Sequence, residues 1–184
     1  CPRDSFPDPL TLMQTTLFVA VALGLALPVL AQGSTCGDNA INTNFGVALG
    51  GGDDALFSVT TSFPIVFPDG TQTTDIDITT NGRIFPVGGD TTDFSPSAAG
   101  FVTETTQIAG AWIDMTFDAG ATSTPDQVDL NDLGSSVLIT WNDARTFPGD
   151  TLFTIQVELF PNGDARFAYD SRFNPADGLS LGGD

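Results

Sequence analysis

The stretch from Thr151 to Tyr169 constrains the fold of this chain more than any other segment. Its first half has an apolar residue at every second position: Phe153, Ile155, Val157 and Leu159. The positions between them hold Thr154, Gln156, Glu158 and Phe160. Such alternation is the period of a β-strand with one buried and one solvent-facing side. Pro161–Asp164 then supplies the residues of a tight turn and the return strand begins at Arg166, so the stretch predicts a β-hairpin.

A second hairpin is predicted around Asn81-Gly82, because this dipeptide separates two short runs, Asp75–Thr79 and Arg83–Phe85. In the first run, we expect Ile76 and Ile78 to face the core. We expect the alternating polar residues to face solvent: Asp75, Asp77 and Thr79. A Thr79→Ala replacement on such a face is expected to change the stability by less than roughly 0.5 kcal/mol.

The other predicted elements are short. Strands are expected near Phe45–Val47, Leu56–Val59, Phe63–Phe67, Ile108–Phe117 and Ser135–Trp141, and a helical turn at Ala98–Val102. The Ile108–Phe117 segment is apolar on both faces, which favours a central strand. Asp118–Gly134 is expected to be a long polar loop with strand ends near Gln127-Val128. With about eight to ten short strands and no sustained helical period, the predicted fold is all-β, an antiparallel β-sandwich.

The N-terminal part of the chain carries an apolar run of 15 residues, Leu17–Ala31. The run is too short to span a bilayer comfortably and fits the helical core of a signal peptide, with cleavage expected before Gln32. A buried core helix is the alternative, although the run has no polar face. Met13 is a second candidate start, which would make residues 1–12 upstream read-through and leave the segment without a basic side chain.

These features divide the chain into three parts. Residues 1–31 form the cleavable signal peptide, residues 32–52 a flexible lead-in rich in Gly, Asn and Asp, and residues 53–184 the β-sandwich. We expect further sequence to follow Asp184, so that the sandwich is truncated there. The predicted localisation is secreted, extracellular or at the cell surface. After cleavage, Cys36 either pairs with a cysteine beyond Asp184 or stays a free thiol.

The charge of the chain excludes several classes of partner. The net charge is −18, with 5 Lys and Arg against 23 Asp and Glu, and there is no His. This balance repels phosphate backbones and anionic membrane surfaces, so nucleic-acid binding is disfavoured. The lack of His removes the commonest general base and the commonest transition-metal ligand. The acidity serves either the solubility of the surface or the binding of a cation such as calcium.

Two acidic segments are candidates for calcium binding. Asp53-Asp54 follows three glycines, but neither its spacing nor its repetition matches the calcium-binding nonapeptide. Asp129–Gly134 resembles the start of an EF-hand loop, but Leu133 stands where an oxygen ligand is required. We therefore assign no metal ligands, and a calcium site built from other loop carboxylates and carbonyls stays open.

One pair of carboxylates has the spacing of the catalytic groups of glycosidases. Asp75 and Asp77 are expected on one strand face, about 6–7 Å apart from the rise per residue. The alternative, which we favour, is a solvent-facing polar stripe that includes Thr79. Trp112 and Asp114 also share a face of their strand, with Trp112 expected to fill the core and Asp114 to bond backbone in a neighbouring turn.

The basic and nucleophilic side chains indicate no reaction. Four arginines are scattered, and each is expected to pair with a carboxylate at the surface: Arg83, Arg145, Arg166 and Arg172. Serines and threonines lack a histidine to activate them, and no GxSxG sequence is present. A sugar-stacking role for Trp112 or Trp141 would need an exposed ring. We assign no catalytic or cofactor-binding residue.

Taken in order, the motifs of the chain resemble a known family. They are GDDAL at 52–56, FPDG at 67–70, IDITTNGRIF at 76–85, DFSPS at 93–97, IAGAWIDM at 108–115, VLITWNDA at 137–144, FTIQVELFPNGDARFAY at 153–169 and ADGLSLGG at 176–183. This order is similar to the nidogen-like (NIDO) extracellular domain, above all to its version in secreted bacterial proteins, over about Asp53–Gly183. The resemblance implies an extracellular β-rich sandwich and, as in animal members, cell–matrix adhesion, without an established catalytic set. The chain departs from the family at Gly110-Ala111, where Ala-Pro is common.

These observations lead to two hypotheses of different classes. The favoured one is a non-enzymatic module, structural or adhesive, that a bacterium secretes or displays on its surface. The alternative is a carbohydrate-binding or carbohydrate-acting extracellular domain, supported by the sandwich fold, two Trp and abundant Asp. The partner is accordingly expected to be an extracellular protein or a glycan, and neither a nucleic acid nor an anionic membrane.

Overall fold

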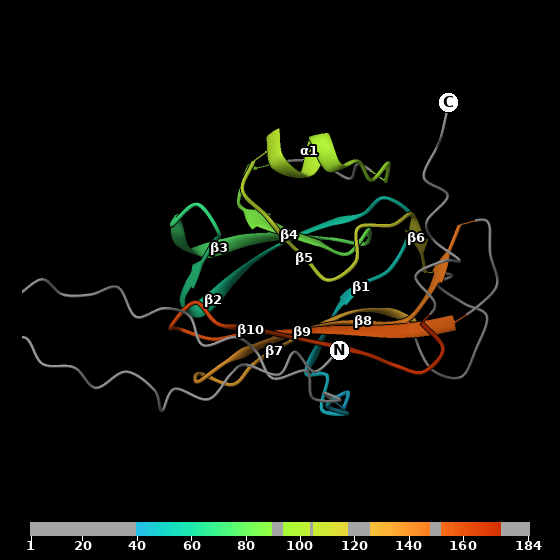
Figure 1. Ribbon diagram of the computed structural model, residues 1–184. Coiled ribbons are helices and arrows are strands. Elements are labelled where there is room, and N and C mark those ends of the chain that lie inside the picture. The colour runs from blue at the N-terminus through green and yellow to red at the C-terminus, as the bar shows by residue number, and fades with distance from the viewer. Residues whose placement is uncertain (1–39, 90–93, 104, 118–125, 148–151, 174–184) are drawn as a thin grey trace, which may run out of the picture. The chain divides into compact units, whose positions relative to one another are not determined.

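A computed structural model describes residues 40–89, 94–103, 105–117, 126–147 and 152–173 of the chain. These residues form ten strands and one short helix, and the strands make two antiparallel sheets (Figure 1). The predicted all-β class and the count of eight to ten strands are therefore confirmed. The predicted signal segment 1–31, its cleavage site and Cys36 lie outside the described residues, as does the ADGLSLGG motif. Within the described part of the chain, no helix has the length and apolar character needed to cross a membrane.

The larger sheet has six strands, with the order β1-β7-β8-β9-β10 and with β6 also paired to β8. Its strands are β1 (Val47–Gly50), β6 (Met115–Thr116), β7 (Gln127–Asp132), β8 (Val137–Thr146), β9 (Leu152–Leu159) and β10 (Ala165–Tyr169). β8 and β9 form its centre, as expected for the apolar SSVLITW segment and the first arm of the Thr151–Tyr169 hairpin. The pairing of these two strands is interrupted between Trp141 and Ala144, where Asp143 has a φ of 49°.

The smaller sheet has four strands in the order β2-β3-β4-β5. Its strands are β2 (Leu56–Val66), β3 (Gln72–Thr79), β4 (Arg83–Pro86) and β5 (Ile108–Ala109). The two strands predicted at Leu56–Val59 and Phe63–Phe67 are one long edge strand, whose pairing with β3 shifts register between Thr60 and Ile65. The predicted helical turn is α1 (Ala98–Thr103), which lies outside this sheet in Figure 1.

The core lies between the two sheets. Apolar side chains of β3 and β4 meet those of β8 and β9, and the fully buried members of this core cluster include Ile76, Ile78, Ile84, Ile139, Trp141, Ile155 and Val157. Two sheets packed in this way interdigitate the side chains of their inner faces. Burying each such side chain stabilises the fold by roughly 1.5–3 kcal/mol.

Three hairpins of the sandwich share one kind of turn. In each, a glycine with positive φ donates its N–H to the carbonyl three residues earlier: Gly70 to Phe67, Gly82 to Thr79 and Gly163 to Phe160. The φ values are 89°, 79° and 86°, in the left-handed region that glycine enters without a side-chain clash. This turn, three residues long with a glycine at its end, matches the twist of the flanking strands. Both predicted hairpins are confirmed.

The Ile108–Phe117 segment does not form the single central strand that its sequence predicts. Its start is β5, which pairs with β4 in the smaller sheet, and its end is β6, which pairs with β8 in the larger one. The segment thus crosses the core from one sheet to the other. A Cβ atom at Gly110 would lie 2.9 Å from Val157 Cγ2, so the backbone passes directly against the core. Core on both sides explains why both of its faces are apolar.

The predicted solvent-facing sides of β3 and β9 are partly wrong. Asp75 is exposed as expected, but Asp77 and Thr79 are buried. On β9, Thr154 and Gln156 are buried as well. The cause is that further segments cover these faces, because Gly88 N donates to Asp77 Oδ2 at 2.9 Å and Asn42 N donates to Gln156 Oε1 at 2.9 Å.

Two segments expected to be loops contribute strands to the larger sheet. The end of the predicted long loop is β7, a strand of 6 residues that pairs with β8 along its length. Within the predicted lead-in 32–52, β1 pairs with β7 through Val47 and Leu130 and through Ala48 and Asp129. β1 begins at the end of the segment where a short strand was expected, Phe45–Val47. The described part of the lead-in therefore packs on the sandwich.

Candidate functional site

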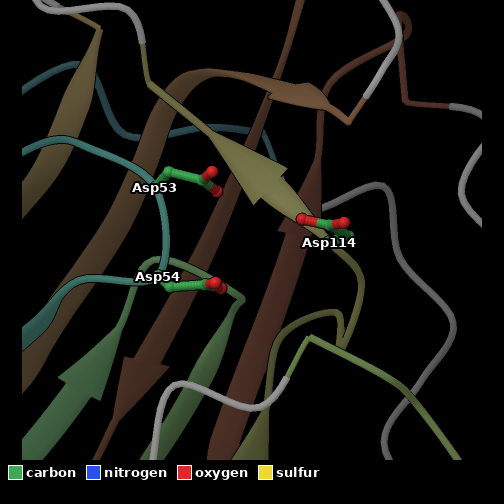
Figure 2. A group of neighbouring side chains, drawn as sticks. All are labelled: Asp53, Asp54 and Asp114. Atoms are coloured by element: carbon green, nitrogen blue, oxygen red, sulfur yellow. The ribbon is translucent and has the colours of Figure 1, made fainter.

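Three carboxylates from distant parts of the chain come together beside β6: Asp53, Asp54 and Asp114. One carboxylate oxygen of each lies within 4.8 Å of one oxygen of each of the others. Asp53 and Asp54 belong to the loop between β1 and β2, and Asp114 directly precedes β6. Figure 2 shows the side chains of Asp53 and Asp54 extending toward the side on which Asp114 lies. We call this group the aspartate cluster.

Backbone bonds hold the first two members of the aspartate cluster against β6. Asp53 forms an antiparallel bridge with Thr116, and Phe117 N donates to Gly52 O at 3.1 Å. Asp54 has a φ of 51°, an uncommon value for a residue with a Cβ atom. The glycines that precede these aspartates allow this tight approach, because a Cβ at Gly51 would lie 2.9 Å from that of Phe117.

The turn residue Asn81 fixes the orientation of Asp54. Asn81 is fully buried, and its Nδ2 donates to Asp54 Oδ1 at 2.8 Å. Its Oδ1 accepts from Met115 N at 2.9 Å. One amide therefore connects the β3–β4 turn, the loop of Asp54 and the first residue of β6, next to Asp114.

The electrostatics of the aspartate cluster are set by its like charges. Partial burial, followed by the negative charges of Asp53 and then Asp54, raises the pKa of Asp114 above its ordinary value. Asp53 is exposed, while Asp54 and Asp114 are half-buried. Carboxylate oxygens are ligands of hard cations, and Ca²⁺ takes about 6–8 oxygen ligands in all, from carboxylates, carbonyls and water. The cluster could hold such a cation, but exposed acidic groups are common without one, so the geometry by itself assigns no metal.

The sequence pointed to two of these three residues. Asp53-Asp54 suggests a calcium loop, but we assign no metal ligand there from the sequence because the spacing and repetition do not match, and the structure brings both carboxylates into one group. Asp114 was assigned only a bond to backbone, and its approach to Asp54 follows from the crossing of the Ile108–Phe117 segment between the sheets. As the one charged residue within the apolar segment Ile108–Phe117, Asp114 carries a local signal that could have drawn attention to it.

The other candidate calcium segment, Asp129–Gly134, lies in β7 and its turn. The carboxylate of Asp132 accepts from Ser62 N and Ser62 Oγ, both at 2.6 Å, and from Gly134 N at 3.0 Å. Although its slight burial acts to raise the pKa of Asp132, these hydrogen bonds hold it below the ordinary value. The side chain ties the β7–β8 turn to the edge strand β2.

The predicted carboxylate pair of β3 is divided between two environments. Asp75 is exposed and accepts from Thr60 Oγ1 at 2.7 Å. Asp77 is buried and accepts from Ser58 Oγ and from Gly88 N. Both side chains therefore connect β3 to neighbouring segments, which favours the structural interpretation over a catalytic pair.

The tryptophans lie in the core, as predicted. Trp141 is fully buried, and its Nε1 donates to Thr79 O at 2.8 Å. Trp112 is 9% exposed, and the guanidinium carbon of Arg83 lies 3.9 Å from the centre of its ring. Neither ring is open to a sugar.

The surface role predicted for Arg83 is wrong. Its side chain is fully buried, stacks on Phe85 as well as Trp112, and donates through Nε to Gln107 Oε1 at 2.7 Å. Stacking on aromatic faces suits the weakly hydrated guanidinium group. No local sequence pattern indicates Gln107 as its partner, because the two residues are 24 positions apart.

The other arginines pair with carboxylates as predicted. Arg145 lies 3.9 Å from Asp126 and Arg166 lies 3.0 Å from Glu158. Arg172 binds Asp143 at 2.8 Å and also contacts Asp170. The Arg145–Asp126 pair is largely buried, with side chains 16% and 4% exposed, so it is not the surface pair that the sequence predicts. The more exposed pairs of Arg166 and Arg172 contribute little to stability.

Comparison of the chain with protein-family models, with curated proteins and with solved structures finds no match. The functional interpretation therefore starts from the residues of this chain and from their geometry.

Proposed function

We propose that this chain is a non-enzymatic β-sandwich module, secreted or displayed on a cell surface, with a structural or adhesive role toward extracellular proteins. The nidogen-like order of its motifs motivates the adhesive interpretation. The N-terminal apolar run motivates the extracellular location. Neither the adhesive role nor the extracellular location rests on a site in the described structure. The proposal therefore depends on which partners the polar side chains of the sandwich bind.

The observation that carries the proposal is the pairing of hydroxyl groups with carboxylates between segments. Four pairs show this pattern: Ser58 with Asp77, Thr60 with Asp75, Ser62 with Asp132 and Ser136 with Glu158. A catalytic hydroxyl needs an adjacent base and a free path to substrate. These hydroxyls instead donate to carboxylates across strands and turns, which supports a rigid scaffold.

The alternative of a carbohydrate-binding domain has weaker support. A sugar ring stacks on an exposed aromatic face, and both Trp side chains are buried. The carboxylates of the smaller sheet accept bonds from Ser58 and Thr60, which reduces their capacity to bind sugar hydroxyls. We therefore keep the protein-binding module as the proposed function.

Surface plasmon resonance on the immobilised full chain tests this proposal. We expect saturable binding to at least one member of a panel of purified extracellular matrix proteins, and none to a matched panel of glycans. The heat-denatured chain serves as the control for adsorption to unfolded protein. Saturable binding to a glycan, or release of reducing sugar from a polysaccharide, would contradict the proposal.

A further inference from the structure

A cavity of about 310 Å³ opens between the edge strand β5 and the turns of two hairpins. Its wall is mostly apolar and includes Val66, Phe67, Phe101, Ile108 and Ala165, together with one polar side chain, Gln107. The residues therefore come from both sheets and from α1. Small-molecule sites have this character, with an apolar lining and few polar groups, and this cavity is at the low end of their range of about 300–1,000 Å³.

The amide of Gln107 has a defined orientation. Its Oε1 accepts from Arg83 Nε at 2.7 Å, and arginine has no acceptor atom, so the oxygen rather than the nitrogen faces Arg83. Gln107 is 3% exposed, and its Nε2 has no hydrogen-bond partner among the residues that the structure describes. Buried donors without a partner are rare, because they lose their hydrogen bonds to water and form none in the protein, which costs free energy.

We propose that this cavity binds a small, uncharged, apolar molecule that carries a hydrogen-bond acceptor oxygen, such as the carbonyl of a ketone, ester or amide. The apolar wall receives the body of the molecule, and its oxygen accepts a hydrogen bond from Gln107 Nε2. Because Nε2 exposes less than 1 Å² of surface, this bond requires the amide to shift slightly toward the cavity on binding. The described wall contains no charged side chain, so an ionic ligand would find no partner there. The net charge of −18 disfavours an anion further. This site goes beyond the proposed adhesive function and does not depend on it.

The neutral naphthyl ketone Prodan is a suitable probe, because its emission responds both to apolar surroundings and to hydrogen bonding at its carbonyl. Titrated into the full chain, Prodan is expected to bind saturably with a shifted emission. The variant Gln107→Glu keeps an oxygen for Arg83 Nε but replaces the Nε2 donor with a second acceptor. It is expected to weaken binding by roughly tenfold or more.

A second variant tests the cavity without changing Gln107. Ala165 is exposed on β10 and belongs to the wall, so Ala165→Trp is expected to fill the opening and remove binding. Ala48→Trp is the matched control, since Ala48 is exposed on β1, at the other edge of the same sheet. We expect this control to bind Prodan as the parent does.

Three results would overturn the proposal. The first is the absence of saturable Prodan binding to the parent chain. The second is unchanged affinity in either Gln107→Glu or Ala165→Trp, since the first variant tests the hydrogen bond and the second tests the cavity. The third is an affinity that falls as the protein concentration rises, which would show that a second copy of the chain occupies the cavity.

Discussion

The amide nitrogen of Asn81 lies 2.8 Å from a carboxylate oxygen of Asp54, a residue 27 positions earlier in the chain. Asn81 is fully buried, although an asparagine before a turn glycine is ordinarily a surface residue. The same side chain accepts from Met115 N. Asn81, which the sequence marks as a turn residue, thus also joins Asp54 of the aspartate cluster to Met115, the first residue of β6.

Replacement of Asn81 by Ala is expected to destabilise the fold by about 1–3 kcal/mol, because it leaves the buried Met115 N–H without its acceptor. Urea denaturation monitored by tryptophan fluorescence measures this change. Asn162→Ala is the matched control, since Asn162 occupies the same position before Gly163 but is exposed, and its side-chain bonds within the described part of the chain stay in its own turn, to Asp164. It is expected to cost less than roughly 0.5 kcal/mol. Equal costs would contradict the role assigned to Asn81.

The turn glycines provide a second comparison. A Cβ atom at Gly82 would lie 1.9 Å from Ala111 O, whereas one at Gly70 would meet nothing within 4 Å. Both glycines have positive φ, so Gly70→Ala is expected to cost about 1–2 kcal/mol from backbone strain alone. Gly82→Ala adds a clash with the backbone and is expected to cost clearly more than Gly70→Ala. Thermal unfolding of the two variants checks the order. If their midpoints are equal, the β3–β4 turn does not lie against the crossing segment.

The aspartate cluster makes a prediction about pH. Burial and the charges of Asp53 and Asp54 raise the pKa of Asp114, so the folded chain binds this proton more readily than the unfolded chain does. The charged carboxylate therefore opposes folding above its folded pKa, and the penalty is relieved as the pH falls through that value. Asp114→Asn removes the penalty, and it is expected to stabilise the chain at pH 7 and to lose this advantage as the pH is lowered.

Urea denaturation of Asp114→Asn and the parent at several pH values between about 7 and 3 measures this effect. Asp69→Asn is the control of opposite sign. A backbone hydrogen bond from Thr71 lowers the pKa of Asp69, so its charge favours folding at pH 7, and that contribution is lost on acidification. The prediction for Asp114 fails if Asp114→Asn, like the control Asp69→Asn, destabilises the chain at pH 7.

Local sequence signals predict the hairpins of this fold because a turn and its flanking strands depend on neighbouring residues. Pro161–Asp164 and Asn81-Gly82 each form the predicted turn, with glycine in the left-handed region. The burial of Trp141 also follows from its place in an apolar strand. These features can be predicted without knowing which distant segments of the chain pack against them.

The predictions of burial and contacts are wrong where a segment distant in the sequence packs against the side chain. Gln156 alternates with apolar residues and so predicts a solvent-facing side chain, yet the backbone of Asn42 covers it. Asp114 meets Asp54 only because its segment crosses the core. Arg83 is buried because Gln107 and two aromatic rings surround its guanidinium group. Periodicity indicates which face of its own sheet a side chain lies on, but it does not indicate which other segments pack against that face.

Thr79 tests this distinction directly. The alternating pattern places it in solvent and predicts that Thr79→Ala is almost neutral, whereas in the structure it is fully buried and its Oγ1 accepts from Arg83 N at 3.3 Å. Burial therefore predicts a loss of about 1–2 kcal/mol in the free energy of unfolding. Thr60→Ala is the control, because Thr60 is exposed on the adjacent strand and bonds to exposed Asp75. Chemical denaturation of both variants should show a clear loss for Thr79 and a change within roughly 0.5 kcal/mol for Thr60. Two changes of similar, small size would mean that Thr79 faces solvent after all.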